Sequence, residues 1–308
     1  MTNIPFDQID EDSFIEVPGS VPSVQVPLQL VGITNRPHYI NVLDPFNGEP
    51  TRLFADMKLS LNLPADQRGL HMSRIERMMH NVELEDPLAL VDYARELVRQ
   101  ILATQPQQRC RVEITADYEL VVNKNKSGKP SHELMKLYVA ADSIDGVIKI
   151  EKSITVKIMN ACPCAQRWGI RAFSDSLKQQ GFTAGQIAKI AESAPLQGHT
   201  QHGDATLQLN SDEADYKDLY KVLEKSSPIV HELLSGSDEG DFVGKTQQRG
   251  MFVEDVIREI MKFTVSDLGK SISDDTKLNI HVDVDESVHQ HNLFSTVEDT
   301  FGNLKSQF

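Results

Sequence analysis

The side chains best suited to chemistry lie in the segment Asn160-Ala161-Cys162-Pro163-Cys164, which contains two of the three cysteines of the chain. The preceding residues, from Ile148 to Ile158, alternate between apolar and polar types and therefore predict a half-buried strand. Pro163 fixes its own φ and lacks an amide hydrogen, as is typical of a turn at a strand end. A thiolate at this position can bind a metal ion or attack a carbon atom.

Imidazole groups occur in two segments far from Cys162 in the sequence. His199 lies at the other end of a long stretch that begins at the cysteines, and His289 and His291 follow an alternating segment at 278–284. If the long stretch is a hairpin-like excursion, its ends meet and His199 lies beside Cys162. If the strand at 278–284 continues, the other two histidines point to one side. A Cys, a carboxylate and one or two His would form a mixed metal site with room for water. A lone loop histidine is more often an ordinary surface residue.

Two acidic segments offer carboxylates. Ser237-Asp238-Glu239-Gly240-Asp241 is predicted to be a flexible, exposed loop. Glu254 falls in the first turn of a predicted helix whose buried stripe is Val253, Val256, Ile257, Ile260 and Met261. The helix dipole favours a carboxylate there, which is a purely structural explanation. The functional alternative is that Glu254 accepts two parallel N–H bonds, as the amidine edge of a guanine would supply.

Two segments carry cations. Gly69-Leu-His-Met-Ser-Arg74 combines His71, Ser73 and Arg74, and such a loop can contact phosphate through the guanidinium and the hydroxyl. The structural alternative is a helix-entry loop capped by Ser73. Asn123-Lys-Asn-Lys-Ser-Gly-Lys129 is predicted to be a basic hairpin loop between two strands.

The surrounding pattern predicts elements that position these segments. Alternation predicts strands near 53–63, 112–120, 134–140, 148–158, 205–209 and 278–284. Helical spacing predicts helices near 75–80, 90–101, 165–180, 183–193, 215–235 and 251–264, with Asp86-Pro87 at the start of the second. The order strand, strand, helix, helix, strand, strand occurs twice. It indicates an α+β protein with antiparallel sheets covered on one face by helix pairs.

Composition limits the function. With 308 residues and 40% hydrophobic residues the chain can bury a large core, so disorder throughout is excluded. A net charge of −14 argues against a general nucleic-acid binder, although a local group of Lys and Arg can hold one small anion. No apolar run approaches a membrane span, and Met1 to Asp12 is acidic where a signal peptide would be basic, so a cytoplasmic protein is expected. Three cysteines do not make a disulfide framework.

Taken together, these segments resemble the type IB GTP cyclohydrolases, metal-dependent enzymes that make dihydroneopterin triphosphate. The resemblance covers roughly residues 27 to 300 and rests on ordered motifs: Gly69-Leu-His-Met-Ser-Arg74, Cys162-Pro-Cys164, His199-Thr-Gln201, Asp238-Glu239, Phe252-Val-Glu-Asp255 and Glu286-Ser-Val-His-Gln-His291. The chain departs from the family pattern at Ala165, where Ser is common, and at His202, where Arg is common. It also has a longer connection between Cys162 and His199.

The resemblance implies a bimodular tunnelling fold of two β-β-α-α-β-β units and a homotetramer with active sites at subunit interfaces. On this basis we expect an extended N-terminal arm over 1–25, a first unit over 26–145 and a second unit over 146–308. A helical insertion is expected at about 163–198 within the second unit.

The resemblance also implies the site. Cys162, Glu239 and His289 would hold one divalent ion, Zn, Mn or Fe, with His199 as a further ligand or a proton-transfer group. Glu254 would anchor the guanine of GTP. The triphosphate would be bound by cations, for which the candidates are Arg74, Lys124, Lys126, Lys129, Lys245 and Arg249, joined by His71 and Ser73.

The implied reaction is attack of water on guanine C8, with Cys162 and His199 as catalytic residues. It releases formate and gives 7,8-dihydroneopterin 3'-triphosphate, and it would be the first step of tetrahydrofolate biosynthesis. One alternative is a related nitrile reductase that uses NADPH and a Cys162 nucleophile on a deazaguanine. Another is a non-enzymatic purine-binding or zinc-binding module without an open coordination position.

Overall fold

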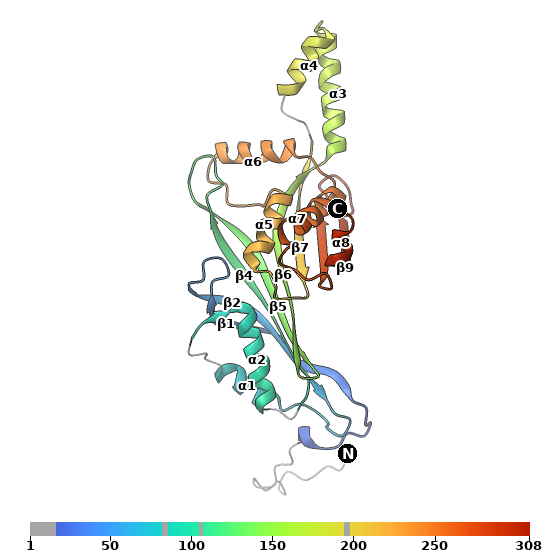
Figure 1. Ribbon diagram of the computed structural model, residues 1–308. Helices are drawn as coiled ribbons and strands as arrows, with labels where there is room; N and C mark the ends of the chain where they lie inside the picture. The colour runs from blue at the N-terminus through green and yellow to red at the C-terminus, as the bar shows by residue number, and fades with distance from the viewer. Residues whose placement is uncertain (1–16, 82–85, 105–106, 194–197) are drawn as a thin grey trace, which may run out of the picture.

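A long antiparallel sheet organises the molecule (Figure 1). The computed structural model describes residues 17–81, 86–104, 107–193 and 198–308. Within them the sheet has the order β3-β1-β2-β4-β5-β6-β7-β8-β9, and only the short β3 is parallel to its neighbour. The strands are β1 (Leu28–Leu43), β2 (Pro50–Leu63), β3 (Leu88–Ala89), β4 (Cys110–Val122), β5 (Ser131–Ile144), β6 (Val147–Ala161), β7 (Thr200–Leu209), β8 (Lys277–Val284) and β9 (Leu293–Thr300).

Helices cover one face of this sheet, and strands and helices together form two similar units. The helices are α1 (Met72–Asn81), α2 (Leu90–Thr104), α3 (Pro163–Gln179), α4 (Ala184–Ser193), α5 (Tyr216–Ser226), α6 (Gly236–Gln248), α7 (Val253–Leu268) and α8 (Phe301–Lys305). The first unit runs β1-β2-α1-α2-β4-β5 and the second β6-β7-α5-α7-β8-β9, with α6 added between α5 and α7. The predicted α+β class and the order predicted for a bimodular tunnelling fold are therefore confirmed.

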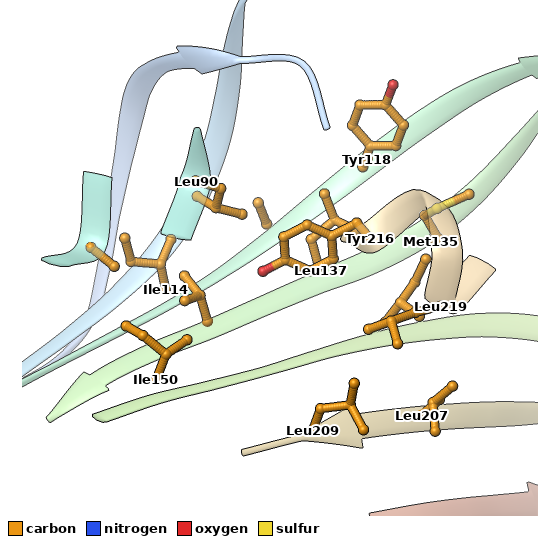
Figure 2. Close-up of a cluster of buried hydrophobic side chains, with 14 of the residues drawn as sticks. Leu90, Ile114, Tyr118, Met135, Leu137, Ile150, Leu207, Leu209, Tyr216 and Leu219 are labelled. Carbon is orange, nitrogen blue, oxygen red and sulfur yellow. The ribbon is translucent and has the colours of Figure 1, made fainter. Parts of the chain in front are cut away.

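The core lies between the sheet and these helices because the inward-facing residues of every central strand are apolar. Figure 2 shows Leu137, Ile150 and Leu209 on three neighbouring strands, with Tyr216 and Leu219 of α5 packed over them. Ile114, Leu137 and Leu209 are fully buried. The core is continuous across β5 and β6, so both units share it.

Most predicted elements are present, with three corrections. The segment at Pro87 does not open a helix, because Leu88 and Ala89 pair with β1 before α2 begins at Leu90. The acidic segment 237–241 is the first turn and a half of α6, not a flexible loop. The helix expected over 215–235 ends at Ser226. The pattern also did not single out β1 or β9, which lie at or next to an edge of the sheet and have few buried residues.

An excursion of two helices, α3 and α4, leaves the sheet between β6 and β7 and projects from one end of the molecule (Figure 1). At its base Ala161 pairs with Thr200, so the two ends of the excursion meet, as predicted. Residues 1–16 of the expected N-terminal arm lie outside the described residues; those that follow include a short 3-10 helix at Val17–Gly19. No helix in the described ranges is long and apolar enough to cross a membrane.

Candidate active site

Three segments converge at Cys162, which directly follows the end of β6. The backbone N–H of Cys162 donates to the carbonyl of His199 over 3.1 Å. On the other side, the N–H of Met251 donates to the carbonyl of Ala161 over 3.1 Å, and the Asn160 side chain donates to the carbonyl of Met251 over 3.2 Å. Hydrogen bonds thus hold together the end of β6, the start of β7 and the start of α7. Cys162 is the N-cap of α3 and is half-buried, whereas Cys164 is exposed.

A pair of glutamines fixes this junction. Gln166 donates to the backbone and side-chain oxygens of Gln247 over 2.6 and 2.8 Å, and Gln247 donates to the carbonyl of Gly198 over 2.9 Å. The glycines permit this close packing, because a Cβ on Gly250 would lie 2.3 Å from the Gln166 side-chain oxygen. The base of the excursion is therefore anchored to the end of α6.

His199 is held by the loop that follows β8. Its Nδ1 lies 3.0 Å from the Ser287 hydroxyl and 3.5 Å from a carboxylate oxygen of Glu286. The Glu286 side chain is only 4% exposed, and the same oxygen accepts the N–H groups of Ser287 and Val288. With Nδ1 occupied, the Nε2 atom of His199 is the one left for a ligand.

Glu286 begins the motif Glu286-Ser-Val-His-Gln-His291, but its sequence context predicted no role for it. A carboxylate three residues before His289, directly after a strand, was the available signal. What it did not reveal is that Glu286 is buried against His199.

The histidine pair lies in the same loop. The strand does not continue beyond Val284, so the assumption that placed His289 and His291 on one side of a strand is wrong. Their rings nevertheless stack, with centroids 5.3 Å apart and an interplanar angle of 12°. Both residues are exposed.

Glu254 lies in the first turn of α7, as predicted, and is exposed. The neighbouring Asp255, not Glu254, caps this helix: its carboxylate accepts the N–H of Phe252 over 3.1 Å and pairs with Arg258 at 2.9 Å. The capping role is therefore already filled. In the described part of the chain the Glu254 carboxylate has no hydrogen bond or ion pair, which leaves it available to a ligand.

The two acidic residues at the start of α6 differ. Asp238 is buried and accepts bonds from the backbone and hydroxyl of Ser127, at 2.8 and 3.0 Å, and from Ser235. It therefore ties the 123–130 loop to α6. Glu239 is exposed on the same turn.

A cavity of about 440 Å³ lies beside the last residues of β6. Pro228 and Ile229 of its wall are bonded to β6 at Met159 and Ile158. Four of the cations considered for the triphosphate line it: Lys124, Lys126, Lys245 and Arg249. The structure therefore gathers basic groups from the 123–130 loop and from α6 around one space.

These cations are not equally free. The Lys124 ammonium is bound by Glu133 at 2.7 Å and Glu224 at 2.6 Å, so its charge is already balanced. Lys245 pairs with Asp241 at 2.7 Å. Lys126 has no ion pair among the described residues and is exposed, as is Lys129.

The remaining predicted phosphate contacts lie elsewhere in the chain. His71 immediately precedes α1, and Ser73 and the backbone of Arg74 belong to its first turn, so Ser73 is not the cap. Figure 1 shows α1 in the first unit, at the opposite end of the sheet from α6 and α3. One chain thus does not bring these three residues to Cys162.

The donor types fit a divalent ion, because a half-buried thiol, imidazole nitrogen and carboxylate oxygen suit borderline metals. Within the described ranges of a single chain, however, no three His, Cys, Asp or Glu side chains are close enough to hold one ion. The third cysteine does not contribute: Cys110 is buried in the core, and burial raises its pKa to about 12.

Comparison with known sequences gives a consistent result. The family model GCHY-1, described as type I GTP cyclohydrolase folE2, matches residues 14–295. A protein named GTP cyclohydrolase MptA from Methanocaldococcus jannaschii is 29% identical over 300 residues, covering 93% of this chain and 95% of its own. Another of that name from Methanococcus maripaludis strain C6 is 28% identical, covering 95% and 97%. GTP cyclohydrolase MptA 2 from Methanocella arvoryzae is 26% identical over 305 residues, covering 95% and 98%.

Among solved structures, a uricase from Bacillus fastidious matches with a TM-score of 0.48 and 8% identity, covering 91% of this chain and 96% of that one. A thermostable AgUricase mutant gives the same TM-score and identity over 91% and 93%.

Proposed function

This chain belongs to the type I GTP cyclohydrolase family, and from that premise we propose that it converts GTP and water into 7,8-dihydroneopterin 3'-triphosphate and formate. The family and the named relatives make it a hydrolase that acts on GTP. The family match over 14–295 carries the proposal, and the junction of Cys162 with His199 supports it. The family match also favours a hydrolase over a nitrile reductase or a non-enzymatic binding module.

We assign guanine recognition to Glu254. Its carboxylate is exposed and unpaired in the described structure, and it belongs to the α7 start that is bonded to the end of β6. Two oxygens on one carboxylate can accept the guanine N1–H and 2-amino group side by side. This places C8, on the opposite edge of the purine, away from Glu254.

We propose that Cys162, Glu239 and His289 hold one divalent ion, Zn, Mn or Fe, which makes this a type IB enzyme, and that His199 acts beside the ion as the proton-transfer group. When bound, the ion lowers the pKa of a water molecule towards about 7 and so supplies a hydroxide nucleophile. Adjacent backbone positions bring Cys162, a proposed ligand, and His199 together. We propose that a second copy of the chain completes the set.

His199 is the proposed proton donor to the ring nitrogen as the imidazole of guanine opens. Glu286 and Ser287 hold its Nδ1, which orients the ring and leaves Nε2 towards the substrate. Glu286 is therefore a positioning residue.

For the triphosphate we propose the cavity beside β6, where Lys126, Lys245 and Arg249 face one space. Lys124 would set the local charge through its two carboxylate partners, and Lys129 lies on the same loop. His71, Ser73 and Arg74 would reach the substrate from a second copy in a homotetramer with interface active sites.

The test is turnover of GTP by purified protein loaded separately with Zn, Mn and Fe. We expect formate and a pterin that becomes fluorescent after oxidation, in equal amounts. Mass spectrometry of the unoxidised product distinguishes the proposed linear triphosphate, which enters tetrahydrofolate biosynthesis, from a cyclic phosphate. No formate with any of the three metals would overturn the proposed reaction.

A further inference from the structure

A second cavity, of about 350 Å³, lies where the two units meet. It is bounded by α2 of the first unit and by the start of α5 in the second. Leu43, Leu90 and Val91 provide apolar wall on one side, and Ala214 and Tyr216 do so on the other. Figure 2 shows Leu90 and Tyr216 on the same side of the strands, over the shared core.

One of the residues that line this cavity is a buried lysine, Lys152. Lys152 lies on β6 between Ile150 and Ile154, on the side that faces the helices, and is only 2% exposed. In the described structure its ammonium has no hydrogen bond and no ion pair, yet it lines an open space. Burial lowers the pKa of this lysine, and the carboxylates of Asp212 and Asp215 only partly offset that effect. An unpaired buried ammonium is unfavourable unless something neutralises it.

Apart from Asp215, the other charged residues that line the cavity already have hydrogen-bond or ion-pair partners. Arg95 is bonded to Asp92 and Asp212, and Asp44 accepts the hydroxyl of Tyr118 at 2.9 Å. Asp215 lines the cavity as the N-cap of α5, but its side chain makes no capping bond. Among the described residues that line this space, Lys152 and Asp215 are therefore one unpaired cation and one unpaired anion.

A ligand of single charge would fit this pair poorly. The Asp215 carboxylate would repel an anion, and the Lys152 ammonium would repel a cation. A zwitterion meets both requirements, and an apolar side chain would be accepted by the walls that Leu43, Leu90 and Val91 provide. We propose that this cavity binds a small α-amino acid with an apolar side chain, whose carboxylate pairs with Lys152 and whose ammonium pairs with Asp215.

This site is separate from the one proposed for GTP. Lys152 and Cys162 are ten residues apart on an extended strand, about 33 Å at roughly 3.3 Å per residue. The ligand would touch α2 and α5 together and so link the two units. Its binding does not depend on the proposed cyclohydrolase reaction.

The experiment is calorimetric titration of the full chain with L-leucine, L-methionine and L-phenylalanine. We expect at least one to bind saturably and to raise the melting temperature. The matched probes for leucine are 4-methylpentanoate, which lacks the ammonium, and 3-methylbutylamine, which lacks the carboxylate. Each should bind roughly tenfold more weakly or worse, because one charged hydrogen bond is lost.

Variants test the two named charges. Lys152→Met and Asp215→Asn should each weaken binding by roughly tenfold or more, whereas Lys149→Met, on the same strand but exposed, should leave it unchanged. All three variants should still release formate from GTP. Absence of binding by every amino acid, equal binding of the single-charge probes, or unchanged binding in Lys152→Met would each overturn the proposal. If wild type binds nothing and Lys152→Met melts at a lower temperature, Lys152 instead stabilises the fold.

Discussion

Cys162 and Cys164 are two positions apart, yet their surroundings differ. Cys162 is half-buried where the ends of β6 and the excursion meet, and Cys164 is exposed in the first turn of α3. We predict that Cys162→Ala abolishes formate release and weakens binding of the divalent ion. Cys164→Ala should retain a measurable part of both. Formate assays and metal analysis of the two purified variants decide this, and equal undiminished activity would remove Cys162 from the site.

Glu254 and Asp255 form a second matched pair of neighbours, in which one carboxylate is free and the other caps α7. We predict that Glu254→Gln raises the KM for GTP or lowers kcat, with metal content and melting temperature near those of the wild type. Asp255→Ala should instead cost roughly 0.5–2 kcal/mol in unfolding free energy, the range found for lost caps, with a smaller effect on turnover. Loss of metal from Glu254→Gln would show that its role was misassigned.

Individual residues could be predicted where their type alone restricts their use. The sequence predicted that Cys162 and His199 lie side by side, and the pairing of the two ends of the excursion confirms that placement. It did not identify Glu286 as a partner of His199, because that contact joins residues 87 positions apart through a loop with no periodicity. Nor did it show that Lys124 is held by Glu133 and Glu224, since ion pairing depends on tertiary position.

At the scale of elements, the turn between β7 and α5 is fastened to the turn before β8 by one carboxylate. Glu213 accepts bonds from the backbone of Ser273 at 2.9 Å and from the hydroxyls of Ser273 and Thr276. The hydrogen bonds from Ser273 are the main reason that its pKa falls from the ordinary 4.5 to about 2. A lowered pKa means that the ionised form stabilises the folded state.

The stabilisation from Glu213 should therefore be complete above about pH 4.5 and disappear as the pH falls from 4.5 towards 2. We predict that Glu213→Gln lowers the melting temperature at neutral pH and makes it depend less on pH over that interval. Thermal unfolding across the interval measures both effects. Glu298→Gln, on the edge strand β9, is the control and should keep the wild-type pH dependence.

Elements were predictable where one face is buried. β2, β4 and β6 alternate because their inward residues enter the core, and the sequence showed this directly. β1 and β9 lie at the margins of the sheet with mostly exposed residues, so their sequences lack the alternation that reports burial. The acidic segment of α6 was mistaken for a loop because Gly236, Ser237 and Gly240 favour a loop and Ser235 was not recognised as the helix cap.

At the scale of the whole molecule, the residues proposed for one active site lie at opposite ends of the sheet. Cys162 lies where α3 begins, whereas α1, which carries Arg74, lies at the other end of the sheet (Figure 1). A symmetric oligomer can bring the α1 end of one copy to the α3 end of another. The proposed interface site therefore predicts that two inactive variants can restore each other.

We predict that Cys162→Ala and Arg74→Ala each have little activity, and that mixing them after reversible dissociation restores formate release to about one quarter of the wild-type value. Random assembly places both intact contributions in about one site in four. The control mixes Cys162→Ala with His199→Ala. Because one chain supplies both of these residues through adjacent backbone positions, no mixed site is intact and no activity should return. Equal recovery in both mixtures, or none in the first, would show that the active site is not divided between copies in this way.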